Sequence, residues 1–303
     1  MHLAIPDNPA DRRQSAFSRN YVLMTAAHNE EAFIERTIES VLSQTVLPKR
    51  WVIVSDGSTD KTNQIVESYA RQHDFICFLK LTRPEGRSFG SKGIALQKGS
   101  KVLDGLSFQF VGNLDADVAV GPAYFETLID HFGRDPQLGI AAGFIYEEQD
   151  GEFRSRAANR VHSVPHAAQL VSQQCYEAIG GYAVLKYGGE DWFAQTCARM
   201  KGWRARALPE LMICHQRQTG VASGLLRHHF RAGRSDYSFG SDPIFEFLKC
   251  AVRVPEKPWL LGAVTRFLGF SWSYISNEER PVSKEFVCFL RKEQRARMLR
   301  AII

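Results

Sequence analysis

The stretch of residues 108–117 constrains the fold most, because it joins a strand to a pair of carboxylates. Residues 108–114 form an apolar run of strand length, and Pro122 opens a helical pattern. Asp115 and Asp117 therefore follow the carboxyl end of a strand, where ligands collect in open α/β sheets. Such a pair suits Mg²⁺ or Mn²⁺ holding a diphosphate, although the motif taken alone is more often a solvated pair in a loop.

Two strand–loop–helix units precede this stretch and predict a parallel sheet. The first is an apolar run at residues 21–25, a loop with Asn29 as a helix cap and Glu30 in the first turn, and then a helical pattern. The second is an apolar run at residues 51–54 with the polar loop 55–60 and another helical pattern. Two such units in succession imply neighbouring parallel strands.

Two loops supply further candidate binding groups. In loop 55–60, the carboxylate of Asp56 can accept hydrogen bonds from a base or ribose; alternatively it makes only a turn, and Asp60 caps the next helix. A basic loop at residues 83–92 ends in Lys92, which could close over an anion or remain solvated.

Composition narrows the class of protein. A chain of 303 residues with 44% hydrophobic content can bury the core of one large domain, with or without an appendage. The six cysteines lack Cys-x-x-Cys spacing, so they suggest neither a zinc site nor disulfides, and a reducing cytosol fits. The first twenty residues are charged and lack a long apolar core, so we expect no secretory signal. The net charge of +5 is compatible with nucleic acid, anionic lipid or a phosphorylated substrate.

Three motifs stand in order along the chain: residues 26–30 after the first strand, 55–60 after the second, and 113–117 after the fourth, which is the run 108–114 and follows a third apolar run at residues 75–81. Together they resemble the nucleotide-sugar-binding half of the inverting glycosyltransferases of the GT-A fold, the group known as family 2. The resemblance implies an α/β fold with a mainly parallel sheet flanked by helices over residues 19–222. A tail of residues 1–18 would precede it, and a helical C-terminal extension at residues 223–303 would follow.

The same resemblance implies roles for individual residues. Thr25 and Glu30 would line the nucleotide pocket, with Asp56 on the base. Asp115 and Asp117 would meet the ribose, a Mn²⁺ or Mg²⁺ ion and the diphosphate of a UDP- or GDP-sugar, with Lys92 nearby on the donor side.

Two further acids open a helical pattern near residue 190. Glu190 and Asp191 follow two glycines, and they resemble the Glu-Asp motif of the family. Acids also belong in a first helical turn for electrostatic reasons alone. The catalytic interpretation makes Asp191 the general base, with Glu190 orienting the acceptor or the base.

His215 follows a strand-like run and has two open interpretations. In several GT-A relatives a histidine at this place completes the metal shell, but a lone histidine is often structural. Residues 216–219 do not match the Gln-x-x-Arg-Trp motif of the processive polysaccharide synthases in the family. We therefore expect transfer of a single sugar.

The C-terminal region alternates basic and apolar features. Arg231 and Arg234 could hold a phosphate of the acceptor. The apolar segment 258–275 contains Arg266 and falls short of the ~20 residues of a spanning helix, so we interpret it either as monotopic or as a buried helix pair. The last helix is basic and amphipathic, which suits an anionic leaflet.

These features predict an inverting glycosyltransferase acting on a lipid-linked saccharide in bacterial surface-polysaccharide assembly, in the cytoplasm at the inner membrane. Two alternatives come from other classes. A nucleotidyltransferase would open with a glycine-rich basic loop, which residues 26–30 are not. A nucleic-acid binder would interleave aromatics with arginines, and the C-terminal aromatics follow apolar segments instead, so we expect no nucleic-acid partner.

Overall fold

The computed structural model describes residues 18–82, 90–149, 151–217, 224–255 and 258–302. The predicted tail at residues 1–18 therefore falls almost wholly outside the described residues. The strands are β1 (Tyr21–Ala27), β2 (Arg50–Asp56), β3 (Ile76–Leu81), β4 (Phe110–Leu114), β5 (Val118–Val120), β6 (Leu138–Gln149), β7 (Glu152–Ser155), β8 (Ala168–Ser172) and β9 (Arg204–His215). The helices are α2 (Ile34–Leu42), α3 (Thr62–Gln72), α4 (Ser91–Ser100), the short 3₁₀ turn η1 (Lys101–Leu103), α5 (Tyr124–Arg134), α6 (Gln173–Ala178), α7 (Glu190–Met200), α8 (Leu225–Ser238), α9 (Pro243–Val252), α10 (Trp259–Ile275) and α11 (Lys284–Ile302).

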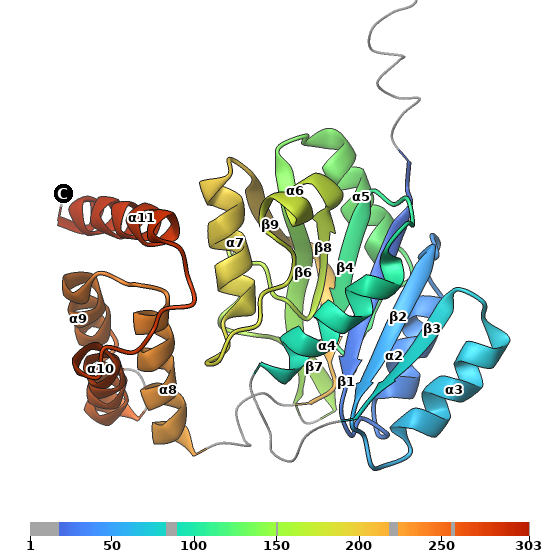
Figure 1. The fold of residues 1–303 in the computed structure, drawn as a ribbon, viewed down its shortest axis with the longest axis horizontal. Coiled ribbons are helices and arrows are strands. Elements are labelled where there is room, and N and C mark those ends of the chain that lie inside the picture. Colours follow the sequence, from blue (N-terminus) through green and yellow to red (C-terminus); the bar gives the residue numbers. More distant parts are fainter. Residues whose placement is uncertain (1–17, 83–89, 150, 218–223, 256–257, 303) are drawn as a thin grey trace, which may run out of the picture.

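One twisted sheet forms the centre of the molecule (Figure 1). Its strand order is β3-β2-β1-β4-β8-β6-β9-β5, with β7 paired to β6. The half β3-β2-β1-β4 is parallel throughout, as predicted from the repeated strand–loop–helix units. The other half is mixed, because β8 runs antiparallel to both β4 and β6, and β5 runs antiparallel to β9.

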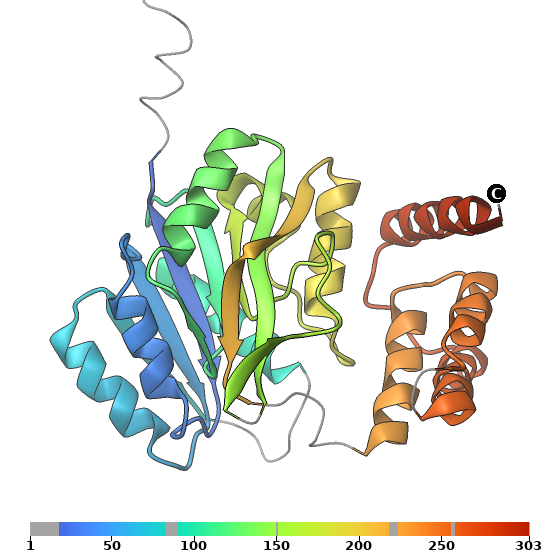
Figure 2. The same cartoon turned by 180° about the vertical axis from the view of Figure 1, so that it is seen from behind.

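Helices cover both faces of the sheet. α4, α6 and α7 lie on the face seen in Figure 1, and α2, α3 and α5 lie on the opposite face, seen in Figure 2. Strands β1 and β4 are consequently buried along nearly their whole length. A strand covered on both sides reads as a continuous apolar run instead of an alternating one, which is why residues 21–25 and 108–114 look as they do in the sequence.

The loop after β1 differs from the prediction in one detail. Asn29 is not a helix cap: α2 starts at Ile34, and Asn29 adopts a left-handed backbone with φ of 55°. Its side-chain oxygen instead accepts a hydrogen bond from the Thr59 amide at 2.9 Å. Asp60 lies one residue before the N-cap of α3, which is Lys61, and its carboxylate accepts from the Thr62 amide at 3.0 Å. The short polar side chain of asparagine tolerates the left-handed turn that the loop requires.

The helical C-terminal extension packs beside α7 (Figure 1). A small apolar cluster, separate from the main core, joins the two parts. Trp192 of α7 lies 4.9 Å from Phe239 between ring centroids, and Phe193 lies 5.0 Å from Phe286.

Within the extension, α10 packs closely on α8. A Cβ atom placed on Gly233 would lie 1.9 Å from the Arg266 carbonyl oxygen, and one on Gly269 would lie 2.0 Å from that of Phe230. Only glycine allows the two backbones to come this close. One face of α10 is therefore buried against its neighbours, which supports the helix-pair interpretation for that face.

The outer faces of α9 and α10 are apolar and exposed. In the part of the chain that the structure describes, no helix combines the length and apolarity of a membrane-spanning segment. The exposed residues, which we call the α9–α10 apolar surface, are Ile244, Phe247, Leu248, Val252, Trp259, Leu260, Leu261, Val264, Leu268, Trp272 and Ile275.

The α8–α10 crossing gives a test of the fold. Gly269→Ala should lower the free energy of unfolding by about 2 kcal/mol, because overpacking outweighs the usual gain of up to ~1 kcal/mol from replacing a helical glycine. Urea denaturation measures this change. Gly121→Ala, where no atom lies within 4 Å of the new Cβ, is the control and should change stability little. A Gly269→Ala protein as stable as the wild type would show that the two helices are not in this contact.

Candidate active site

The candidate site lies at the topological switch point of the sheet, where the connecting helices change from one face of the sheet to the other. The helix after β1, α2, covers one face of the sheet, and the helix before β4, α4, covers the other (Figures 1 and 2). β1 and β4 are neighbours, so their carboxyl ends border the crevice in which open α/β sheets bind ligands. Glu30 follows β1 and Asp115 follows β4, so the structure brings these predicted residues to one place.

Asp115 forms an ion pair with Lys92 at the start of α4. The Lys92 Nζ atom lies 2.5 Å from Asp115 Oδ1, and Asn113 Nδ2 donates to the same oxygen at 2.8 Å. Burial by itself raises the pKa of Asp115, but the charge of Lys92 and these hydrogen bonds outweigh it and hold that pKa below its usual value. Asp115 is therefore ionised and Lys92 is fixed at the sheet edge.

Asp117 lies between His215, the last residue of β9, and Arg217, which follows that strand. His215 Nε2 is 3.7 Å from Asp117 Oδ1, and Arg217 Nε is 3.7 Å from Asp117 Oδ2. Burial first, and then the charge of Asp115, raise the pKa of Asp117, while His215 and Arg217 oppose that rise. The carboxylate is thus held without a tight partner and can accept a positive ligand.

The orientation of His215 favours a metal-binding role. Its Nδ1 atom is in short hydrogen-bond contact with the carbonyl oxygen of Arg217, which can only accept, so Nδ1 carries the proton. In the neutral ring, Nε2 then presents a lone pair toward the carboxylate of Asp117. Two electron-pair donors facing each other fit a shared Mn²⁺ or Mg²⁺ ion.

The protein supplies only part of a metal shell. Among the residues that the structure describes, no three His, Cys, Asp or Glu side chains gather into a complete site. This partial set is compatible with Mg²⁺ or Mn²⁺ chemistry, because such ions commonly take one or two carboxylates and complete their shell with water and substrate phosphates.

Arg217 is a site residue that sequence reasoning missed. Its guanidinium donates to Glu30 Oε2 at 2.5 Å and lies over the ring of Phe33, 5.1 Å from the centroid. Burial first, and then the charge of Asp117, raise the pKa of Glu30 to about 7, although Arg217 lowers it. The available signal was its position two residues after His215, in the bend that follows β9.

Glu190 and Asp191 open α7 on the other side of Lys92. Gly188 and Gly189 precede them in left-handed conformations, with φ of 81° and 91°, which turn the chain into the helix. Asp191 Oδ1 accepts from the Trp192 amide at 2.7 Å. Burial raises the pKa of both acids, and the charge of Lys92 opposes the rise in each. These acids therefore share the electrostatic field of Lys92 with Asp115.

The structure places the remaining donor-side candidates differently. Asp56 ends β2 at the same sheet edge, where its carbonyl oxygen lies 2.8 Å from His28 Nδ1. Thr25 is fully buried, and its hydroxyl accepts a hydrogen bond from the Trp51 indole at 3.0 Å. Thr25 thus lies beneath the site in this structure, and its predicted contact with nucleotide stays a prediction.

The two predicted acceptor arginines have different surroundings. Arg234 donates to both carboxylate oxygens of Glu278, at 3.0 and 3.1 Å, and stacks 4.7 Å over Tyr187. It therefore braces the extension. Arg231 lines a cavity of about 670 Å³ between α7 and the extension.

His166 is a second buried group that the sequence did not single out. Its carbonyl oxygen accepts from Asn113 at 2.5 Å, and within the described residues its ring nitrogens have no hydrogen-bond partner. Burial, and then the charge of Lys92, lower its pKa to about 3. His166 is therefore a neutral ring behind the ion pair of Lys92 and Asp115.

Comparison with known proteins adds a sequence family. The model of the family described as "Glycosyl transferase family 2" matches residues 23–188. A poly-beta-1,6-N-acetyl-D-glucosamine synthase of Staphylococcus epidermidis is 32% identical over 120 residues, which cover 40% of this chain and 27% of that protein. The Staphylococcus aureus synthase is 33% identical over the same shares. The chain thus spans about a quarter of the length of these curated relatives.

Solved structures add the fold. A mannosyltransferase of Pyrobaculum calidifontis, in complex with GDP-Man and Mn²⁺, matches with a TM-score of 0.51 and 17% identity, over 92% of this chain and 80% of that one. Staphylococcus aureus TarS in complex with UDP-GlcNAc matches with a TM-score of 0.51 and 15% identity, over 89% and 78%. At such identities the likeness concerns the fold alone, and it confirms the predicted GT-A architecture.

The Glu30–Arg217 pair makes the site testable by titration. Arg217→Met should raise the pKa of Glu30 above its value of about 7, because removing the positive charge disfavours the carboxylate. Carbon-13 NMR of the side-chain carboxyls, in protein free of divalent metal, measures this. Arg71→Met, on an arginine that is 79% exposed, is the control and should leave the Glu30 titration in place. An unchanged Glu30 pKa in Arg217→Met would show that the pair does not form.

Proposed function

This chain belongs to glycosyl transferase family 2, and on that premise we propose that it moves one sugar from a nucleotide-diphospho-sugar to an acceptor hydroxyl, with inversion of the anomeric carbon. The observation that carries the proposal is that acidic side chains from two parts of the fold interact electrostatically with the same cation, Lys92. Lys92 pairs with Asp115 after β4, and its charge also acts on Glu190 and Asp191 at the start of α7. Family membership disfavours the nucleotidyltransferase and nucleic-acid-binding alternatives.

The proposed donor is a UDP- or GDP-sugar. Structural relatives hold GDP-Man and UDP-GlcNAc, and the sheet edge offers the matching groups in this chain. Asp56 at the end of β2 would accept from the base, and Asp115 would face the ribose. Lys92 supports the proposal because it puts a positive charge beside Asp115 at this sheet edge, and a positive charge favours the binding of a diphosphate.

The proposed metal ion is Mn²⁺ or Mg²⁺, held by Asp117 with help from Asp115 and His215. The supporting observation is the pair of electron-pair donors, Asp117 Oδ1 and His215 Nε2, separated by 3.7 Å. Such an ion supplies charge neutralisation for the departing nucleotide diphosphate. A structural relative was solved with Mn²⁺.

Asp191 is the proposed general base. Its carboxylate removes the proton of the acceptor hydroxyl as the oxygen attacks the anomeric carbon from the face opposite the diphosphate. The bond from that carbon to the diphosphate oxygen breaks as the new bond forms, so the configuration inverts. Burial raises the pKa of Asp191, which strengthens it as a base, and the charge of Lys92 opposes the rise and favours the ionised form. Glu190 orients the acceptor beside it.

The proposed acceptor is a lipid-linked saccharide of bacterial surface-polysaccharide assembly, reached at the cytoplasmic face of the inner membrane. Two surfaces support this proposal. The α9–α10 apolar surface is large and exposed, and an exposed apolar patch of this kind suits the acyl boundary of a bilayer. α11 adds exposed bases that would favour anionic lipid, namely Lys292, Arg295, Arg297 and Arg300.

The metal assignment predicts a specific loss. Asp117→Ala should weaken UDP- or GDP-sugar binding in the presence of Mn²⁺ by about tenfold or more, since the ion loses a carboxylate ligand. In the wild type, a chelator should have the same effect and added Mn²⁺ should reverse it. Calorimetric titration measures the affinity. Normal binding and turnover of the donor by Asp117→Ala would refute the assignment.

The base assignment predicts separable effects on binding and transfer. Asp191→Asn keeps the size of the side chain but removes its basicity, so transfer should fall by about a hundredfold or more. Donor binding should survive, because Asp191 lies on the acceptor side. Transfer rate and donor affinity are measured on the same preparation. Near-normal transfer would exclude Asp191 as the base, and a product with retained configuration would exclude direct displacement.

The membrane proposal predicts an effect of charge on the apolar surface. Leu261→Glu together with Leu268→Glu should abolish flotation of the protein with phosphatidylglycerol vesicles, since both side chains are more than half exposed there. Leu47→Glu, at an exposed leucine near α2, is the matched control and should float as the wild type does. A wild-type protein that shows no preference for anionic over neutral vesicles would contradict the proposal.

A further inference from the structure

The cavity between α7 and the extension begins at the two glycines that precede the proposed catalytic acids. It holds about 670 Å³, which is within the range of ligand-binding pockets. Gly188 and Gly189 form part of its wall, and they immediately precede Glu190 and Asp191. The rest of the wall comes from α8, α9, α10 and α11.

Positive charge predominates in the wall. Five cationic side chains line the cavity, against two carboxylates. One of these carboxylates, Glu293, is already paired with Arg199, outside the cavity, at 2.9 Å. The five cationic residues are Arg231, Lys249, Arg253, Arg266 and Arg297, and the acidic ones are Asp236 and Glu293.

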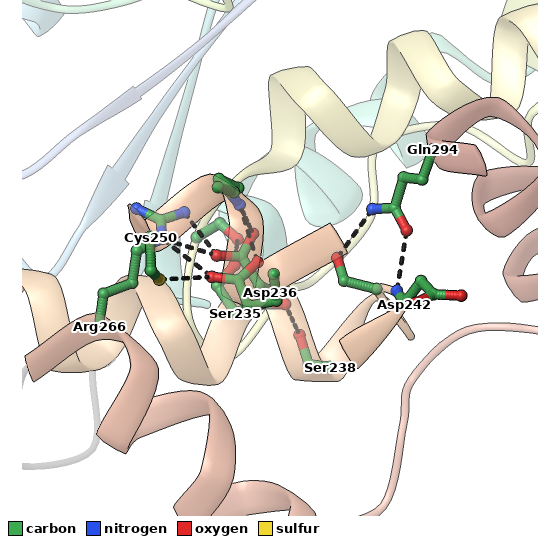
Figure 3. Close-up of polar contacts among 11 residues, drawn as sticks. Ser235, Asp236, Ser238, Asp242, Cys250, Arg266 and Gln294 are labelled. Carbon is green, nitrogen blue, oxygen red and sulfur yellow. Dashed lines mark hydrogen bonds and ion pairs between the residues drawn. The ribbon is translucent and has the colours of Figure 1, made fainter. Parts of the chain in front are cut away.

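A buried ion-pair network fixes one side of the cavity. Figure 3 shows Arg266 of α10 reaching Asp236 of α8, and the guanidinium lies 2.5 Å from that carboxylate. Lys249 Nζ lies 2.7 Å from Asp236 and 3.1 Å from Glu246, which is fully buried and also pairs with Arg266. Even with Glu246 counted, the cations around the cavity outnumber the carboxylates.

The state of His228 agrees with this charge balance. His228 is part of the wall, and burial, followed by the positive charge of Arg231, lowers its pKa. Burial disfavours a charge of either sign, but the part of the shift that is due to Arg231 reflects a positive potential, which favours an anion. The positive potential at His228 therefore agrees with the excess of cationic over acidic side chains in the wall of the cavity.

The cavity is lined in part by the two helices that also carry the apolar surface. Its wall includes Phe245 and Arg253 of the α9 segment and Arg266 of α10, and the outer faces of α9 and α10 carry the α9–α10 apolar surface. The cavity therefore lies between the start of α7 and the helices whose outer faces form the α9–α10 apolar surface.

We propose that this cavity binds the phosphate or diphosphate group that joins the acceptor saccharide to its lipid. The inference rests on the proposed function and deepens it by naming the part of the acceptor that the extension recognises. Arginine is suited to this task because its planar guanidinium binds phosphate oxygens in pairs. In this proposal the saccharide extends past Gly188 and Gly189 toward Asp191, and the lipid extends toward α9 and α10.

The test is direct binding to the full-length protein in the presence of a chelator. The probes are inorganic pyrophosphate and farnesyl diphosphate, titrated by calorimetry against the wild type and against Arg231→Gln with Arg297→Gln. We expect both probes to bind, farnesyl diphosphate more tightly, and the double variant to lose about tenfold or more in affinity for each. Arg231→Lys with Arg297→Lys should recover part of the loss, which separates a charge effect from misfolding.

Two controls locate the binding. Arg300→Gln removes an exposed arginine from the same helix as Arg297, outside the cavity, and should bind both probes normally. Lys92→Met removes the cation of the donor side and shows whether the probes bind there instead. Binding that falls with Lys92→Met but not with the double variant would assign the anion to the donor site and overturn the inference.

The remaining outcomes are also decisive. If phosphatidylglycerol vesicles bind but neither soluble probe does, the arginines serve the membrane surface and the inference fails. Because probe binding requires no transfer, an enzyme that binds farnesyl diphosphate through Arg231 and Arg297 but transfers no sugar would refute the proposed function alone. An enzyme that transfers sugar normally in the double variant, with unchanged probe binding, would refute the cavity assignment alone.

Discussion

The ion pair between Lys92 and Asp115 is the interaction on which the site depends. Four acidic side chains, those of Asp115, Asp117, Glu190 and Asp191, gather near the ends of β4 and α7. Without a compensating cation, their mutual repulsion and burial would favour protonation of several of them. Lys92 offsets that cost for each of the four, and its own position is fixed by the 2.5 Å contact to Asp115. The parallel half of the sheet matters because it delivers α4 and β4 to the same edge.

Much of this arrangement could be predicted from the sequence. The apolar runs of β1, β2 and β4 are local features, and a loop that follows a parallel strand must emerge at the same sheet edge as its neighbours. Asp115, Asp117 and Glu30 can therefore be placed together on the order of strands and loops alone. Asp191 can be placed at a helix start, because two glycines and two acids mark that position. These predictions concern chain order and local pattern, which a single sequence contains.

The parts that could not be predicted depend on contacts between distant segments. Arg217 pairs with Glu30 across 187 positions of sequence, and no local pattern indicates such a partner. The antiparallel entry of β8 between β4 and β6 likewise has no signature, because a buried strand reads the same in either direction. Asn29 is typical of a cap by residue type, but its place in a left-handed turn is set by the neighbouring loop at Thr59. Arg234 is typical of a phosphate ligand, but the distant Glu278 occupies its guanidinium.

The aromatic contacts between α7 and the extension have a consequence for how this protein can be divided. Trp192 is adjacent to Asp191 in sequence, and its ring rests on Phe239 and Phe286. Helix α7, which carries the proposed base, is therefore supported by residues that follow the last strand of the sheet in the sequence. The predicted boundary near residue 222 therefore separates two parts of the chain that are not structurally independent domains. Cutting the chain there would leave the ring of Trp192 facing water and the base on a helix with one side unsupported.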